Sequence, residues 1–181
     1  VVSIEDEGEL HGVLQLINNR DDRPFGAVEV EGAHQLCETL AIAFRKRREL
    51  RVVAERSAAI SRDAILVFST LRNERVRLPF FLRYYREMGV NHFFIVDNDS
   101  DDGSREYLAE QPDVSLWTTT HSYKRARFGV DWLNWLQMKH GHNHWCLVVD
   151  PDEFFVYPFC DTRPLRALTD WLDASSIKSF S

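Results

Sequence analysis

The sequence is poor in several features that mark particular classes of protein. It holds three cysteines among 181 residues, Cys37, Cys146 and Cys160, which is an odd number at no metal-like spacing. We therefore expect reduced thiols and a cytoplasmic location. An excess of positive charge is also lacking, since the formal net charge is −6. That balance argues against a general nucleic-acid binder.

Long apolar runs are missing as well. The longest, such as "AILVF" and "CLVV", are far too short to cross a bilayer, so we expect no transmembrane segment. We likewise expect no signal peptide, and the chain opens on "VVSIEDEGEL" without a methionine, which suggests a fragment or a processed chain. The apolar content of 44% is nevertheless enough for the core of one or two domains.

The first 50 residues are predicted to form a hairpin followed by a helix. The segments "VVSI" and "HGVLQLIN" flank the turn "EDEGE", and the loop "RDDRPFG" leads into a helix over about 28–51. An apolar face is expected on this helix from the spacing of Leu36, Leu40, Ala43 and Phe44.

That helix ends in the basic stretch "FRKRRELR". Such a stretch is usually a solvated helix face, although contact with anionic lipid, and so a peripheral membrane association, stays open. Around the helix end runs the polar stretch "ELRVVAERSAAISR", and we expect residues 51–62 to link two unequal parts of the chain.

The second part alternates strands and helices. Apolar runs predict strands over 64–70, 92–97, 114–120 and 144–150. Helices are predicted between them, over about 77–88, in "REYLAEQ" and near 126–140. The pattern indicates an α/β fold with a mostly parallel sheet, whose ligands bind beyond the carboxyl ends of the strands.

Two of these helices have a clear apolar stripe, which we expect to lie in the core. In the first, Pro79 suits the opening turn and Gly89 the C-terminal cap. Its stripe consists of Leu78, Phe81, Leu82, Tyr85 and Met88. The later stripe consists of Phe128, Trp132, Trp135 and Leu136.

The most informative stretch is "WCLVVDPDEFF", in which an apolar strand runs into acidic residues. In an extended backbone, residues two apart point to the same side, so Asp150 and Asp152 could converge on one cation. Carboxylates beside a diphosphate are how proteins hold Mg²⁺ or Mn²⁺. A strand that simply ends in an acidic turn is the alternative.

A second acidic loop, "DNDSDDGS", follows the strand over 92–97. Asp97, Asp99 and Asp101 fit an EF-hand, but Asp102 occupies its glycine position and Leu108 its glutamate position. The EF-hand interpretation therefore fails. Turn formation explains the rest of the loop well and Asp97 less well.

Two further segments allow two interpretations each. The histidines of "HGHNH" alternate with Cys146 and could suggest zinc, although a polar turn before a strand is the simpler explanation. In "HSYKRARF" the cations could face a diphosphate or lie at a solvated helix start. These cations are Lys124, Arg125 and Arg127.

Three motifs occur together in one order over residues 63–160: "LVFSTLRNE", "FFIVDNDSDDGS" and "LVVDPDEFF". With them the segment resembles the nucleotide-sugar-binding half of GT-A glycosyltransferases of the family 2 type. The bacterial branch with "DPDEF", and the related family 92, are most similar. The resemblance implies a GT-A fold, Rossmann-like with helices flanking the sheet, and a donor-binding half over residues 63–181.

The resemblance also implies roles for particular residues. Asp97 would bind the base, and Asp150 and Asp152 would bind the Mn²⁺ or Mg²⁺ that bridges the diphosphate. Glu153 is a candidate catalytic carboxylate near the site, but the family's base lies well after the D-x-D motif, so we expect this chain to lack it. The nucleotide pocket would be lined by Leu71, Arg72, Asn73 and Glu74, with Arg125 or Arg127 near the diphosphate.

The first 50 residues have a resemblance of their own. The stretch "HGVLQLINNRDDRPFG" and the helix after it look like the C-terminal end of a GAF sensor domain, which would make this segment a partial α+β unit. An ordinary hairpin and helix is the equal alternative.

We therefore expect the donor-binding portion of a metal-dependent, inverting glycosyltransferase. It would use a nucleotide diphosphate sugar and a glycan, lipid or protein acceptor. A GAF-like sensory module with a non-catalytic nucleotide-binding domain is the alternative. Phosphoryl or nucleotidyl transfer is a further rival, although the sequence holds no P-loop motif.

Overall fold

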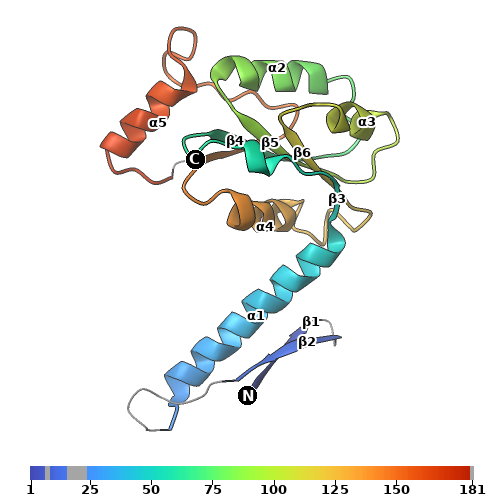
Figure 1. Ribbon diagram of the computed structural model, residues 1–181, viewed down its shortest axis with the longest axis vertical. Coiled ribbons are helices and arrows are strands. Elements are labelled where there is room, and N and C mark those ends of the chain that lie inside the picture. Colours follow the sequence, from blue (N-terminus) through green and yellow to red (C-terminus); the bar gives the residue numbers. More distant parts are fainter. Residues whose placement is uncertain (7–8, 16–23, 180–181) are drawn as a thin grey trace. The chain divides into compact units, whose positions relative to one another are not determined.

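The computed structural model describes residues 1–6, 9–15 and 24–179, and the side chains of residues 6, 9, 11 and 42–48 lie outside this description. The chain forms two compact units, unit 1 over Val1–Glu49 and unit 2 over Leu50–Ser181 (Figure 1). Each unit has its own buried cluster of apolar side chains and is described by itself.

Unit 1 is a hairpin with a helix packed on it. Strands β1 (Val2–Asp6) and β2 (Glu9–Leu14) pair antiparallel, and α1 spans Ala27–Glu49. The ladder continues to the pair Asp6 and Glu9, so the strands extend into the predicted turn. The end of the predicted second strand, residues 16–18, lies outside the described residues.

The buried face of α1 differs from the prediction. Leu36 is 48% exposed, and the helix instead contacts the hairpin through Ala33, Cys37 and Ala41. The buried face of α1 is therefore shifted by one position from the predicted face, because small side chains lie against the strands. Leu40 is half-buried, whereas the side chains of Ala43, Phe44 and the basic stretch lie outside the described part.

The predicted linker over 51–62 is partly wrong. Residues Arg51–Ala54 form strand β3, which pairs antiparallel with β6 (Val114–Thr118), and Ser57–Ala59 form a short 3-10 helix. The Arg56 guanidinium donates to the carbonyls of Ala109 and Val114, at 2.7 and 2.8 Å. The exposed edge position of β3 explains why its sequence resembles that of a polar connection.

Unit 2 is built on a five-stranded sheet in the order β3-β6-β5-β4-β7. Strands β4 (Ile65–Leu71), β5 (His92–Asp97), β6 and β7 (Trp145–Val148) are parallel to one another, and β3 alone is antiparallel. The prediction of an α/β unit with a mostly parallel sheet is confirmed.

Helices cover both faces of this sheet (Figure 1). On one face lie α2 (Leu78–Met88), α3 (Ser104–Ala109) and α5 (Leu165–Ala174), which pack in one apolar cluster with β4 and β5. On the other face α4 (Val130–His140) packs through Trp132 and Leu136. The carboxyl edge of the sheet is left to the loops.

Helix α2 is confirmed in detail. All five residues of its predicted stripe are buried, Pro79 lies in its first turn, and Gly89 caps it at φ 99°. Helix α4, by contrast, begins at Val130 rather than near 126, since Arg127, Phe128 and Gly129 all have positive φ and cannot be helical. The predicted core residue Phe128 is consequently 64% exposed.

Strand β7 is less buried than its apolar composition suggests. Among the described strands only β4 pairs with it, so β7 lies at the edge of the sheet and Val148 is 53% exposed. Within the described residues, the helices are all too short or too polar to cross a membrane.

Candidate functional site

The topology of unit 2 singles out one place on the sheet. The chain runs from β4 through β5 to β6 in one direction and then returns to place β7 on the other side of β4. The carboxyl ends of β4 and β7 are therefore a topological switch point, where α/β sheets open a crevice for ligands.

A cavity of about 360 Å³ lies at this point, and we call it the acid cavity. Its walls come from the loops that follow all four parallel strands. The residues that line it are Thr70, Leu71, Arg72, Glu74, Asn98, Tyr123, Asp150, Pro151 and Asp152.

The D-x-D segment forms a turn and not the extended continuation of β7 that we predicted. The Glu153 N–H donates to the Asp150 carbonyl at 3.0 Å, closing a four-residue turn. Proline favours the second position of such a turn, where Pro151 lies, and aspartate suits the first. Asp150 and Asp152 nevertheless both line the acid cavity.

Two tyrosines of α2 hydrogen-bond the backbone at the end of this turn and just after it. The buried Tyr85 hydroxyl donates to the Glu153 carbonyl and accepts from the Phe155 N–H, both at 3.1 Å. The Tyr84 hydroxyl donates to the Phe155 carbonyl at 2.8 Å. The acidic turn is thus fixed to a helix whose own position is set by the core.

The electrostatics of the cavity favour a cation. Burial, and after it the charges of Glu153 and Asp152, raise the pKa of Asp150 above its ordinary value. Nearby, the Arg77 guanidinium binds Glu74 at 2.6 Å, and this bond together with the charges of Glu74 and Asp152 raises the pKa of Arg77. A divalent cation between the two aspartates would relieve their repulsion.

The donor set also fits an ion that completes its shell with other ligands. Within the described residues, no three His, Cys, Asp or Glu side chains gather closely enough to enclose a metal. Mg²⁺ retains several waters and binds protein through one or two carboxylates plus substrate phosphates. Asp150 and Asp152 match that mode of binding.

Asp97 is not among the residues that line the cavity. Its carboxylate is fully buried and pairs with the Arg105 guanidinium at 2.7 Å. It also accepts from the Thr118 hydroxyl and the Ser100 N–H, both at 3.3 Å. The lining residue at the end of β5 is Asn98, the next along the chain.

The structure separates the four residues predicted after β4. Leu71, Arg72 and Glu74 line the acid cavity, whereas Asn73 does not. The Asn73 side chain accepts from the Asp101 N–H at 3.0 Å, and its backbone φ is 59°. Asn73 therefore joins two loops of the carboxyl edge.

The predicted cations lie away from the cavity. Arg127 pairs with Asp131 at the start of α4, with 2.5 Å between its Nε and the carboxylate. Arg125 and Lys124 are exposed and are not among the lining residues. The neighbouring Tyr123 is the residue of this segment that lines the cavity.

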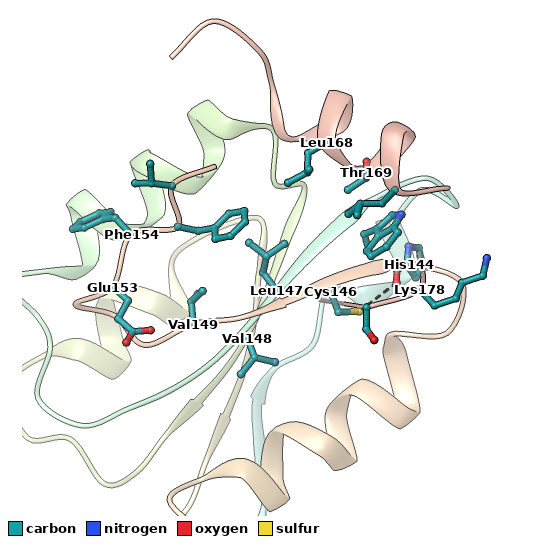
Figure 2. Close-up of a pocket in the computed structure, with 15 residues that line it drawn as sticks. His144, Cys146, Leu147, Val148, Val149, Glu153, Phe154, Leu168, Thr169 and Lys178 are labelled. Atoms are coloured by element: carbon teal, nitrogen blue, oxygen red, sulfur yellow. Dashed lines mark hydrogen bonds between the residues drawn. The ribbon is translucent and has the colours of Figure 1, made fainter. Parts of the chain in front are cut away.

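Glu153 belongs to a different depression. A groove of about 700 Å³ runs along the outer edge of β7, bordered by α5 and by the segment after the acidic turn. Figure 2 shows Glu153 at one end of this groove, with His144 and Lys178 toward the other. The candidate catalytic carboxylate is therefore not brought into the acid cavity.

Sequence reasoning missed four of the lining residues, Thr70, Asn98, Tyr123 and Pro151. Each lies at the end of a predicted strand or in the loop after it, which is the signal that could have found them. The predictions favoured charged residues and therefore named neighbours of these residues instead.

The chain matches no protein-family model, no curated protein and no solved structure. Its function is therefore inferred from the acid cavity and the sequence motifs that surround it.

Proposed function

We propose that unit 2 is the donor-binding portion of a metal-dependent glycosyltransferase with a GT-A-like fold. The observation that carries this proposal is the acid cavity. It joins the D-x-D aspartates after β7 to Leu71 at the end of β4 and to Arg72 and Glu74 in the loop that follows, at the switch point of the sheet. Phosphoryl or nucleotidyl transfer would use the same acids. The combination of three motifs, however, resembles that of the glycosyltransferases.

Asp150 and Asp152 would hold Mn²⁺ or Mg²⁺, which when bound neutralises the diphosphate of a nucleotide sugar and stabilises it as a leaving group. The chain's own contribution is to place these carboxylates, since the two hydrogen bonds of the Tyr85 hydroxyl fix the turn that carries them. Arg72 adds a cation to the lining of the cavity.

Acceptor activation needs a further base within hydrogen-bond reach of the attacking hydroxyl. Of the cavity's described acids, two are the metal ligands and the third, Glu74, is paired with Arg77. Glu153 lies in the groove beside β7. We propose that these 181 residues bind donor and transfer sugar inefficiently.

Calorimetry with UDP- and GDP-linked sugars tests the donor site. We expect binding in Mn²⁺, and its loss both in EDTA and in the Asp150→Asn/Asp152→Asn variant. The matched control is Asp170→Asn, because Asp170 is exposed on α5 and lines neither depression. Equal affinity with and without EDTA would remove the metal role from both aspartates.

A further inference from the structure

We propose that Tyr123 is a ligand-binding residue of the acid cavity, and that its hydroxyl donates a hydrogen bond to the diphosphate held at Asp150 and Asp152. This inference rests on the function proposed above. It assigns to the loop over 119–129 a contact that neither the motifs nor the charges of the sequence indicate.

The first observation is the position of the ring. Tyr123 lines the cavity together with both aspartates and is 39% exposed. Its ring packs edge-to-face on Phe128, with 5.8 Å between centroids, and lies 6.5 Å from Trp132. The ring is thus supported by aromatic neighbours while part of it stays open to the cavity.

The second observation concerns the hydroxyl itself. No described residue hydrogen-bonds it. Burial, and next the charge of Asp150, raise the pKa of Tyr123 above its ordinary value of 10.0. The phenol therefore keeps its proton at neutral pH, and it can donate to an anionic oxygen.

The loop that carries Tyr123 is anchored at its start. The Asn98 side-chain amide donates to the carbonyls of Thr119 and His121, at 3.1 and 3.0 Å. The Thr119 N–H donates to the Asp97 carbonyl at 3.0 Å. Tyr123 follows this anchored segment, and its own carbonyl accepts from the Phe128 N–H at 2.9 Å.

The end of the loop packs closely against Thr70 of β4, which lines the cavity. Arg127, Phe128 and Gly129 have φ values of 48°, 59° and 80°, a left-handed run that side chains disfavour. At Gly129 an added Cβ would lie 2.9 Å from the Thr70 hydroxyl oxygen, so the backbone itself touches β4. Strain of this kind persists where the surrounding structure enforces it, and it clusters at ligand sites.

Charge makes the diphosphate the fitting partner. The ionised side chains of Asp150 and Asp152 are acceptors only, which suits the cation and would repel an anion. A neutral donor near Asp150 can bind a phosphate oxygen without competing for the metal. Tyr123 and Arg72 are the lining side chains that can donate to an anion from outside the acidic turn, apart from the already engaged Asn98 amide and the buried Thr70 hydroxyl.

The test uses the full chain and three probes, Mn²⁺ alone, inorganic pyrophosphate with Mn²⁺, and UDP with Mn²⁺. We expect Tyr123→Phe to weaken both diphosphate probes by roughly ten- to a hundredfold, as for loss of a hydrogen bond to a charged group. Its affinity for Mn²⁺, measured by electron paramagnetic resonance, should not change. Tyr107→Phe is the matched control, because Tyr107 lies on α3 outside the cavity.

The other outcomes separate this inference from the function on which it rests. If the wild type binds Mn²⁺ and UDP, and Tyr123→Phe binds both equally well, the inference is wrong while the donor site stands. The same holds if only Tyr123→Ala is weakened, since the ring would then matter without its hydroxyl. Weaker UDP with unchanged pyrophosphate would move the contact to the nucleoside. A wild type that binds no probe would overturn both proposals.

Discussion

Asp150 links the stability of the protein to the ligand that it is proposed to bind. Its carboxylate lies beside those of Asp152 and Glu153, and its pKa is raised by burial and by both neighbours. A group with a raised folded-state pKa binds more protons in the folded than in the unfolded chain. Its contribution therefore favours folding at low pH, and is lost as the pH rises from its unfolded value of 3.8 through the raised pKa.

Asp150→Asn should consequently have opposite effects on stability and on binding. In EDTA at neutral pH we expect a higher Tm than the wild type, because one repelling charge is removed. Mn²⁺ affinity should be lost in the same variant. In the wild type, Mn²⁺ affinity should fall as the pH is lowered through the pKa of Asp150, which is raised from its ordinary value of 3.8. Thermal melts and Mn²⁺ titrations across pH measure these effects, and a lower Tm in EDTA would contradict them.

Asp97 and Asn98 show how far single residues could be predicted. The sequence places a polar residue at the carboxyl end of β5, and the structure has one lining the cavity there. Which of two adjacent residues faces the ligand depends on a partner distant in sequence. Arg105 and Thr118 bind the Asp97 carboxylate and bury it, and neither contact can be deduced from spacing along the chain.

At the scale of elements, α2 serves as the support of the acidic turn. Its apolar stripe, predicted from spacing alone, buries Tyr85 in the core while the hydroxyl reaches the Glu153 carbonyl. The position of the metal ligands thus depends on a helix that contributes no ligand itself.

Tyr85→Phe should weaken Mn²⁺ binding without removing any ligand. The loss of two hydrogen bonds should also reduce the free energy of unfolding by roughly 1–3 kcal/mol. Tyr157→Phe is the matched control, since Tyr157 is similarly buried and its hydroxyl donates to the Arg163 carbonyl instead. It should lose less stability, because a single hydrogen bond is removed, and keep its Mn²⁺ affinity. Equal Mn²⁺ affinities in the two variants would show that the hydrogen bonds of the Tyr85 hydroxyl do not position the turn.

The elements that were misjudged share a cause. Strand β3 is short and exposed, and β7 looks central by composition although it lies at an edge. The start of α4 depends on the left-handed run over 127–129, of which only Gly129 is visible in a sequence. Apolar periodicity reports what an element buries, whereas these features depend on which strands become its neighbours.

At the scale of the whole molecule, the alternation of strands and helices predicts the parallel sheet but not the order of its strands. The return of the chain across β4 creates the switch point, and with it the place where the three motifs meet. Unit 1 does form a hairpin closed by a helix, as either of its interpretations requires. Its likeness to a GAF domain stays a prediction.

The most direct measurement is an anomalous difference map from crystals of the full chain containing Mn²⁺ and UDP. We expect one strong manganese peak between the carboxylates of Asp150 and Asp152, with the diphosphate beside it in the acid cavity. A map in which UDP is bound but no manganese lies at these aspartates would contradict the proposed donor site.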